Sequence, residues 1–138
     1  MTLARDLMTP DPAYVTETQS IAHAARILRD LDIGSLPVCS DEELLRGVLT
    51  EHQIVTTCVA DGADPNAMRV GELTCGPPAT IGVDRDIREA LRMMQQRRIR
   101  RLHVTDGGRL VGLISLADVT RCLADDDPEE DVEASSAA

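Results

Sequence analysis

Two short phrases of the same kind, 65 positions apart, constrain this 138-residue chain more than any other feature of its sequence. Residues 47–54 read GVLTEHQI and residues 112–119 read GLISLADV. Each phrase runs from a glycine through a short apolar strand to a hydroxyl residue and then to the start of a helix. The preceding segments ARDLMTPDPAYV and VGELTCGPPATI align as well. The chain is therefore expected to contain two copies of one folding unit.

Both copies show the same order of structural signals, which predicts the element order β-α-β-β-α. Apolar residues recur at helical spacing after Ser20 and after Asp86, so these two residues are the expected helix N-caps. The run Asp106-Gly107-Gly108 predicts a tight hairpin turn in the second copy. The expected strands are 13–15, 35–39, 45–50, 79–81, 101–105 and 110–115, and the closing helices are expected near 51–60 and 116–123.

One copy of this size is small for independent stability, whereas two copies can bury each other's sheet faces. The expected fold is therefore α+β, with two tandem units packed through their sheets. The expected division is a first unit at 1–62, a linker and lead-in at 63–72, a second unit at 73–124 and an acidic tail at 125–138. That tail holds seven of the 24 acidic residues and no basic residue, which predicts disorder.

Composition and spacing argue against several classes of function. Aromatic residues make up only 1% of the chain, which disfavours nucleic-acid binding through base stacking. The four cysteines and three histidines have no zinc-ligand spacing, so no metal site is expected and a redox or metal role is a weak alternative. No hydroxyl nucleophile has a plausible paired base and orienting acid, so no enzyme activity is expected. Because residues 1–8 do not resemble a signal peptide and no apolar run reaches a membrane-spanning length, the expected location is the cytoplasm.

At this level of detail the chain resembles a tandem pair of cystathionine β-synthase (CBS) domains, also called a Bateman module. The likeness rests on the two phrases above and on ILRDLDIGSLPV and MMQQRRIRRLHV before the two hairpins, and it covers roughly residues 4–124. The opening ARDLM, the LPVC ending at Cys39 and the DPN at 64–66 are most similar to small stand-alone actinobacterial hypoxic-response proteins of this family. The resemblance implies pseudo-two-fold symmetry between the units, a homodimer, and a non-catalytic regulatory role.

The resemblance also implies two related sites for adenosyl ligands in a cleft between the units. In the family a Ser or Thr contacts the phosphate or ribose and an Asp takes the ribose hydroxyls; Ser115 and Asp118 match both positions. A carboxylate accepts hydrogen bonds from both hydroxyls of a ribose, and helix amides favour a phosphate. The residues expected at this main site are Ser115, Asp118, Thr80, Ile81, Ile99, Arg100, Arg101 and Leu102. A weaker second site is expected at Thr50, Gln53, His52, Ser35 and Leu36, where Gln53 replaces the acid.

A purely structural interpretation of the same motifs remains open. Ser-x-x-Asp and Thr-x-x-Gln at a helix start are also capping boxes, which satisfy free amides without any ligand. The arginines of residues 97–101 are equally compatible with a solvated surface cluster. Two hypotheses follow: a regulatory protein that binds AMP, ADP or ATP, or else S-adenosylmethionine, with no required cofactor; or a ligand-free stress-response module that recruits a protein partner.

Overall fold

The computed structural model describes residues 1–126, in a mixed α/β fold with two separate sheets. It divides into two compact units. We call them the repeat-1 unit, which comprises Ala13–Pro78 and Gly108–Leu110, and the repeat-2 unit, which comprises Met1–Pro12, Ala79–Gly107 and, among the described residues, 111–126. Each lead-in segment therefore belongs to the unit formed by the other sequence copy. The part of the expected acidic tail at 127–138 lies outside the described residues.

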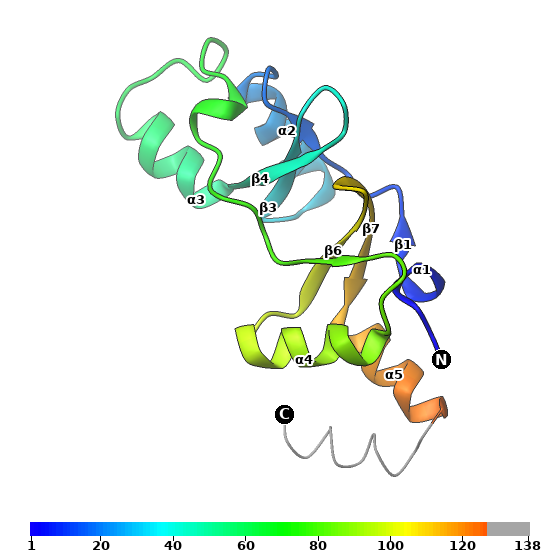
Figure 1. Ribbon diagram of the computed structural model, residues 1–138. Helices are drawn as coiled ribbons and strands as arrows, with labels where there is room; N and C mark the ends of the chain where they lie inside the picture. Colours follow the sequence, from blue (N-terminus) through cyan, green and yellow to red (C-terminus); the bar gives the residue numbers. More distant parts are fainter. Residues whose placement is uncertain (127–138) are drawn as a thin grey trace. The chain divides into compact units, whose positions relative to one another are not determined.

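The repeat-1 unit contains a three-stranded sheet in the order β2-β3-β4 (Figure 1). Strand β3 pairs in parallel with β2 and antiparallel with β4. The core consists of the apolar faces of the sheet and of helix α2. The elements are β2 (Val15–Thr16), α2 (Ile21–Leu31), β3 (Ser35–Cys39), β4 (Leu45–Thr50), α3 (Glu51–Gln53), the π-helix η1 (Ile54–Val59) and the 3-10 helix η2 (Val70–Glu72).

The repeat-2 unit contains a four-stranded sheet in the order β1-β7-β6-β5, with α4 and α5 packed against each other (Figure 1). Strand β5 pairs in parallel with β6, and β1 pairs antiparallel with β7. The elements are α1 (Ala4–Leu7), β1 (Thr9–Pro10), β5 (Thr80–Gly82), α4 (Ile87–Arg97), β6 (Arg101–Asp106), β7 (Arg109–Ser115) and α5 (Leu116–Asp126).

The expected helix signals are confirmed at both first helices. The Ser20 hydroxyl accepts a hydrogen bond from the amide of His23, and the Asp86 carboxylate accepts one from the amide of Arg88. Both helices end at a residue in the left-handed region, Asp32 or Arg98. Each helix buries one apolar face, as the helical spacing of its apolar residues requires. The caps and the period of the sequence therefore fix the position of these two helices.

The strand predictions are confirmed with small shifts at the ends. Strands β3 and β4 have the expected bounds, while β2, β5, β6 and β7 differ from expectation by one or two residues. Gly107 and Gly108, with φ angles of 60° and 85°, form the two-residue hairpin turn. The closing helix of the first copy differs more, because only three residues are α-helical before the chain continues as the π-helix η1. The closing helix of the second copy, α5, extends to Asp126, within the segment expected to be disordered.

The lead-in segments explain why both repeated phrases begin with glycine. In the repeat-1 unit, Val48 forms an antiparallel bridge with Cys75, and a Cβ atom on Gly47 would overlap the carbonyl oxygen of Cys75. In the repeat-2 unit, Pro10 of β1 pairs with Gly112 of β7. Glycine lets a lead-in segment lie directly on the strand in each unit. Within residues 1–126, no helix is long and apolar enough to cross a membrane.

Candidate functional site

The point at which the last strand of each copy turns into its closing helix has the same backbone arrangement in both units. We call residues 50–53 the repeat-1 corner and residues 115–118 the repeat-2 corner. The amide of Glu51 donates to the carbonyl of Gly34 over 2.9 Å, and the amide of Leu116 donates to the carbonyl of Arg100 over 2.7 Å. These bonds place the start of the neighbouring strand, β3 or β6, beside the start of the helix. Each corner thus lies next to the strand that begins with Ser35 or Arg101, two of the residues expected at the ligand sites.

The repeat-1 corner forms a complete capping box. The Thr50 hydroxyl oxygen accepts a hydrogen bond of 3.2 Å from the amide of Gln53, and the Gln53 side-chain oxygen accepts one of 3.0 Å from the amide of Thr50. The Thr50 hydroxyl also lies within hydrogen-bonding distance of that side-chain oxygen, at 3.2 Å. The Gln53 side-chain nitrogen donates to the sulfur of Cys75. The structural interpretation of Thr50-x-x-Gln53 as a helix cap is therefore confirmed.

The repeat-2 corner uses its acidic residue differently. The Ser115 hydroxyl oxygen accepts a hydrogen bond of 3.1 Å from the backbone amide of Asp118, which is one half of a capping box. The Asp118 carboxylate instead pairs with the guanidinium of Arg121, one turn along α5, at 3.3 Å. The Asp118 side chain is 32% exposed and that of Arg121 is 71% exposed. The carboxylate thus retains acceptor capacity that faces solvent, because an ionised carboxylate can accept several hydrogen bonds.

The expected phosphate cradle requires a correction. We expected the first free amides of the closing helices to receive an anion, yet two of the first three amides are occupied in each corner. In α5 the amide of Leu116 bonds to Arg100, and that of Asp118 bonds to Ser115. In the repeat-1 corner the amides of Glu51 and Gln53 are occupied in the same way. These amides donate to the carbonyl before the neighbouring strand and to the cap hydroxyl. Helix amides therefore contribute less to an anion site than the sequence indicated.

Several expected wall residues direct their side chains into the protein core. Ile81 and Leu102 belong to the core of the repeat-2 unit, and Leu36 belongs to the core of the repeat-1 unit. Ile99 is half-buried against the repeat-2 core, and Thr80 is half-buried in β5. At the core positions only backbone polar groups remain for a ligand. Ser35 and His52 are exposed, so they are accessible beside the repeat-1 corner.

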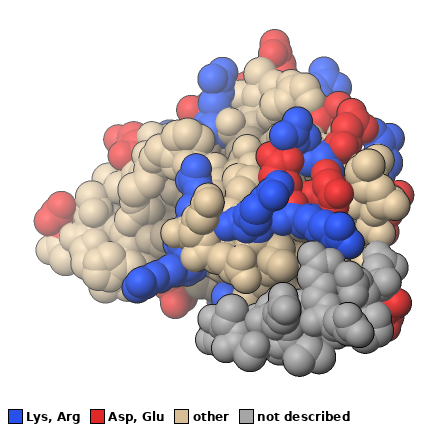
Figure 2. All heavy atoms as spheres, turned by 60° about the horizontal axis from the view of Figure 1, so that its bottom comes forward, with Lys and Arg blue, Asp and Glu red and all other residues tan. Residues whose placement is uncertain are grey.

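Arg100 and Arg101 lie exposed at the start of β6, next to the repeat-2 corner. The Arg100 carbonyl accepts from Leu116, so its backbone is fixed to the first residue of α5. On the face drawn in Figure 2, basic and acidic side chains are intermixed rather than separated. Elsewhere in the repeat-2 unit, Arg85 forms an ion pair with Glu89 at 2.7 Å. Arg100 and Arg101 place two exposed positive charges next to the repeat-2 corner.

His103 is the histidine whose environment departs most from water. It lies half-buried in β6, paired with Thr80 of β5. Burial lowers the pKa of His103 below its usual value of 6.5. The imidazole is therefore held in its neutral form by its surroundings, which fits a packed strand residue better than a ligand-binding cation.

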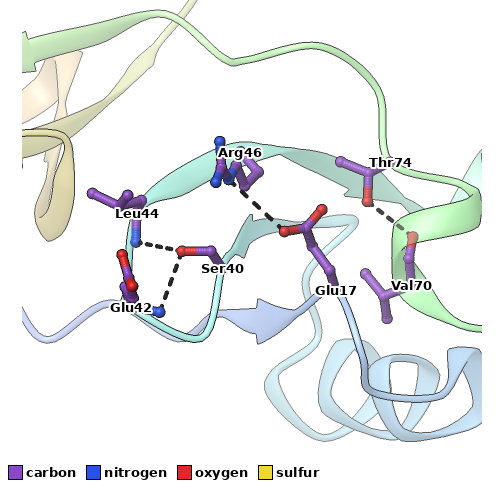
Figure 3. A network of polar contacts seen from close by, with 7 residues as sticks. All are labelled: Glu17, Ser40, Glu42, Leu44, Arg46, Val70 and Thr74. Carbon is purple, nitrogen blue, oxygen red and sulfur yellow. Dashed lines mark hydrogen bonds and ion pairs between the residues drawn. The ribbon is translucent and has the colours of Figure 1, made fainter.

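One polar pocket was not foreseen from the sequence. It lies in the repeat-1 unit beyond Cys39, at the end of β3 opposite the repeat-1 corner. The Ser40 hydroxyl accepts from the amides of Glu42 and Leu44, both at 3.3 Å, and Arg46 lies 3.8 Å from the Glu17 carboxylate (Figure 3). The pocket has a volume of about 280 Å³ and is lined by Glu17, Thr18, Ser40, Asp41, Glu42 and Arg46. The SDEE run of the hairpin was the signal for it in the sequence.

The contact between Gln53 and Cys75 was also missed, because the two residues are far apart in the chain. Shifting the sequence copies onto each other aligns Cys75 with Thr9 and Gln53 with Asp118. The four cysteines are not engaged in disulfides, and Cys75 is exposed. Across residues 1–126, no three or more His, Cys, Asp or Glu side chains are grouped so that they could hold a metal ion.

Comparison with known proteins gives a consistent result. The CBS domain family matches residues 4–59 and 70–125. The chain is 38% identical over 123 residues to hypoxic response protein 1 of Mycobacterium tuberculosis, covering 89% of this chain and 86% of the relative. A crystal structure of hypoxic response protein I with two coordinated zinc ions superposes with a TM-score of 0.75 at 38% identity, covering 89% of this chain and all of that one. A structure of CBSX2 in complex with AMP superposes at 0.70 with 23% identity, covering 89% and 96% of the two chains.

Proposed function

This chain belongs to the CBS domain family, and we propose that it is a non-catalytic regulatory protein that binds one adenosyl ligand at the repeat-2 corner. Proteins with a CBS pair are generally regulatory and do not catalyse reactions. The ligand class is supported by the AMP in the CBSX2 structure, which shares the fold of this chain. AMP, ADP and ATP are the first candidates, followed by S-adenosylmethionine. Binding shifts the population between two arrangements of the chain and so alters a partner's contact.

The Asp118 carboxylate is the observation that carries the proposal. A capping box needs an acceptor at this position to reach back to the amide of Ser115, as Gln53 does for Thr50. Asp118 instead directs its carboxylate to an exposed arginine one turn ahead. An exposed ion pair of this kind contributes little to stability, so a ribose can replace Arg121 at small cost. Two vicinal hydroxyls match the two oxygens of the carboxylate.

Isothermal titration of AMP, ATP and S-adenosylmethionine into the protein tests this proposal. We expect heat of binding for at least one of the three, and we expect Asp118→Asn to weaken binding at least tenfold while the melting temperature of the free protein stays nearly unchanged. Arg46→Gln, which lies in the polar pocket of the repeat-1 unit, is the matched charge-removing control. Equal affinity in Asp118→Asn and Arg46→Gln contradicts the assignment of the site, and the absence of heat with all three compounds contradicts the function.

A second candidate is a ligand-free stress-response module, and the complete capping box of the repeat-1 corner favours it. That corner satisfies its own polar groups, as a purely structural motif does. The relationship to hypoxic response protein 1 fits a stress-response role. On this view nucleotides leave the melting temperature unchanged, and deletion of the acidic residues 125–138 abolishes binding to a protein partner. A nucleotide-dependent rise in melting temperature decides against it, because a ligand that binds only the folded state stabilises that state.

Zinc does not enter this proposal, although the structure of hypoxic response protein I carries two zinc ions. A structural zinc site needs four ligands, mainly Cys and His. The described residues contain no group of even three candidate ligands, and both Cys39 and Cys58 are buried in apolar surroundings.

We further propose that the protein forms a homodimer through its helices. Val55 and Val59 lie four residues apart in η1, with exposed fractions of 58% and 61%. Leu31, the last residue of α2, is 52% exposed. Exposed apolar side chains at helical spacing are more typical of an interface than of a free surface. The resemblance to CBS pairs, in which helices pack at a dimer face, supports the same arrangement.

A further inference from the structure

We infer that Cys75 holds the side chain of Gln53 in place and thereby closes the repeat-1 corner to a ligand, so that each chain binds a single ligand. The inference rests on the proposed function for the identity of the ligand. Beyond that function, it identifies Gln53 and Cys75 as the pair of residues that sets the number of ligand sites per chain.

The side-chain amide of Gln53 has little capacity left for a ligand. Its oxygen interacts with both the amide and the hydroxyl of Thr50, at 3.0 and 3.2 Å. Because an amide oxygen has two lone pairs, these two contacts occupy it fully. The nitrogen donates to the sulfur of Cys75. A ribose that approaches this corner finds a neutral group whose oxygen is already paired, where the family's pattern offers a carboxylate.

The position of Cys75 is fixed by the strand beneath it. Its amide donates to the carbonyl of Val48 over 3.1 Å, and its carbonyl accepts from the amide of Val48 over 3.4 Å. The same lead-in segment is anchored by the Thr74 hydroxyl, which donates to the carbonyl of Val70 over 2.9 Å (Figure 3). Gly47 leaves the space into which the Cys75 carbonyl fits. The backbone that carries the thiol is therefore held beside the repeat-1 corner.

The repeat-2 corner has a different pair of residues, Thr9 and Asp118, at the corresponding positions. Thr9 pairs with Leu113 in the repeat-2 unit, as Cys75 pairs with Val48 in the repeat-1 unit. Asp118 takes the place of Gln53, and its carboxylate contacts the exposed Arg121. The combination of Thr and Asp thus replaces that of Cys and Gln. The repeat-2 corner therefore has a carboxylate that faces solvent, whereas the side-chain amide of the repeat-1 corner is bound within the protein.

The difference between the corners predicts a large difference in affinity. A ligand at the repeat-1 corner has to displace the contacts of Gln53 with Thr50 and with Cys75 before it gains its own. It then gains neutral hydrogen bonds, which are about half as strong as those to a charged carboxylate. Two hydrogen bonds of ordinary net strength, about 1 kcal/mol each, correspond to an affinity ratio of roughly 30-fold. Only the repeat-2 corner is then occupied at moderate ligand concentration.

Exchanging the residue pairs between the corners tests this inference. Gln53→Asp with Cys75→Thr gives the repeat-1 corner the residues of the repeat-2 corner, and Asp118→Gln with Thr9→Cys makes the reverse exchange. The measurement is the stoichiometry of AMP binding per chain by isothermal titration. We expect one site in the native protein, two sites in the first double variant, and none in the second. Circular dichroism and thermal melting verify that each variant is folded.

Each outcome decides the question. Two sites in the native protein, or one site in a folded Gln53→Asp, Cys75→Thr variant, overturn the inference. If the native protein binds no AMP, the proposed function fails, but binding of one AMP by the first double variant still supports the closure of the repeat-1 corner and its absence refutes it. Should that double variant not fold, Cys75→Ala replaces it. A weak second site is then expected, and its absence counts against the role of Cys75.

Discussion

The side chain of Met8 lies over Gly112, so that a Cβ atom added at position 112 would fall 2.9 Å from the Cβ of Met8. Gly47 has the corresponding place in the repeat-1 unit, where the nearest group is the backbone of Cys75. The glycine that opens each repeated phrase is therefore required by the lead-in segment of the other copy and not by the phrase itself. The two contacts differ in what has to move, since one is with a side chain and the other with a carbonyl.

We expect Gly47→Ala to destabilise the protein more than Gly112→Ala. A methyl group at position 47 meets the backbone carbonyl of Cys75, which must shift as a whole. At position 112 the Cγ and sulfur of Met8 can move away by a change of rotamer, and only the contact with its Cβ requires a small backbone shift. Overpacking of this kind costs about 1–3 kcal/mol, with Gly47→Ala at the upper end. Urea unfolding measures the change. Gly76→Ala is the control, because nothing lies within 4 Å of a Cβ at that position; equal losses for all three variants speak against the close approach.

Gln53→Ala is expected to cost more stability than Asp118→Ala. The Gln53 side chain accepts from the amide of Thr50 and donates to Cys75, whereas the Asp118 carboxylate makes an exposed ion pair. Loss of a capping interaction costs about 1 kcal/mol, and loss of an exposed pair at a helix start about 0.5 kcal/mol. Chemical denaturation of both variants provides the comparison. A larger loss in Asp118→Ala would indicate that its carboxylate has a structural role after all.

The fold was predicted from the sequence more completely than the contacts at the two corners. The repeat predicted the element order and the bounds of β3 and β4, because strand ends coincide with turn residues and helix ends with Ser20 and Asp86. It did not predict that η1 would be a π-helix, since no residue of that run breaks the α-helical pattern. At the corners, the sequence identified Ser115 and Asp118 but not Cys75. Contacts between segments distant in the chain leave no local pattern to read.

Stability should depend on pH through His103. Burial lowers the folded-state pKa of His103 below 6.5, so the folded protein favours the neutral imidazole. The contribution is fully present above pH 6.5, decreases as the pH falls through the folded-state pKa, and levels off below it. The measurement is the difference in unfolding free energy between the native protein and His103→Gln as a function of pH. A difference that is independent of pH from 8 to 5 contradicts the burial of His103.

Thiol reactivity should rank the cysteines by exposure. Burial, assisted by the charge of Glu43, raises the pKa of the Cys39 thiol to about 11, so this thiol stays protonated at neutral pH. Cys75 is exposed. Alkylation with iodoacetamide followed by mass spectrometry should modify Cys75 first and Cys39 only on unfolding. Cys75→Ser should remove the fast phase, and rapid modification of Cys39 in the folded protein would disprove this order.

The proposed dimer predicts a charge-sensitive interface on η1. Replacing Val55 and Val59 by Glu buries two charges if these side chains lie in an interface, and an unpaired buried charge is strongly unfavourable. Light scattering should then report a monomer, with the far-ultraviolet spectrum unchanged. Thr56 and Thr57 are also exposed on η1. The controls Thr56→Glu and Thr57→Glu test whether negative charge near this face is by itself sufficient to dissociate the dimer. A native mass of one chain, or a dimer that survives both Val→Glu changes, rules out this face.

The membership of residues 1–12 in the repeat-2 unit also orders the events of biosynthesis. Ala4 is fully buried in that unit, and its amide bonds to Arg85. The ribosome therefore releases this first segment long before its binding surface exists. At common translation rates the interval is on the order of ten seconds. During that time residues 1–12 offer their apolar side chains to chaperones, while the repeat-1 residues can already begin to fold.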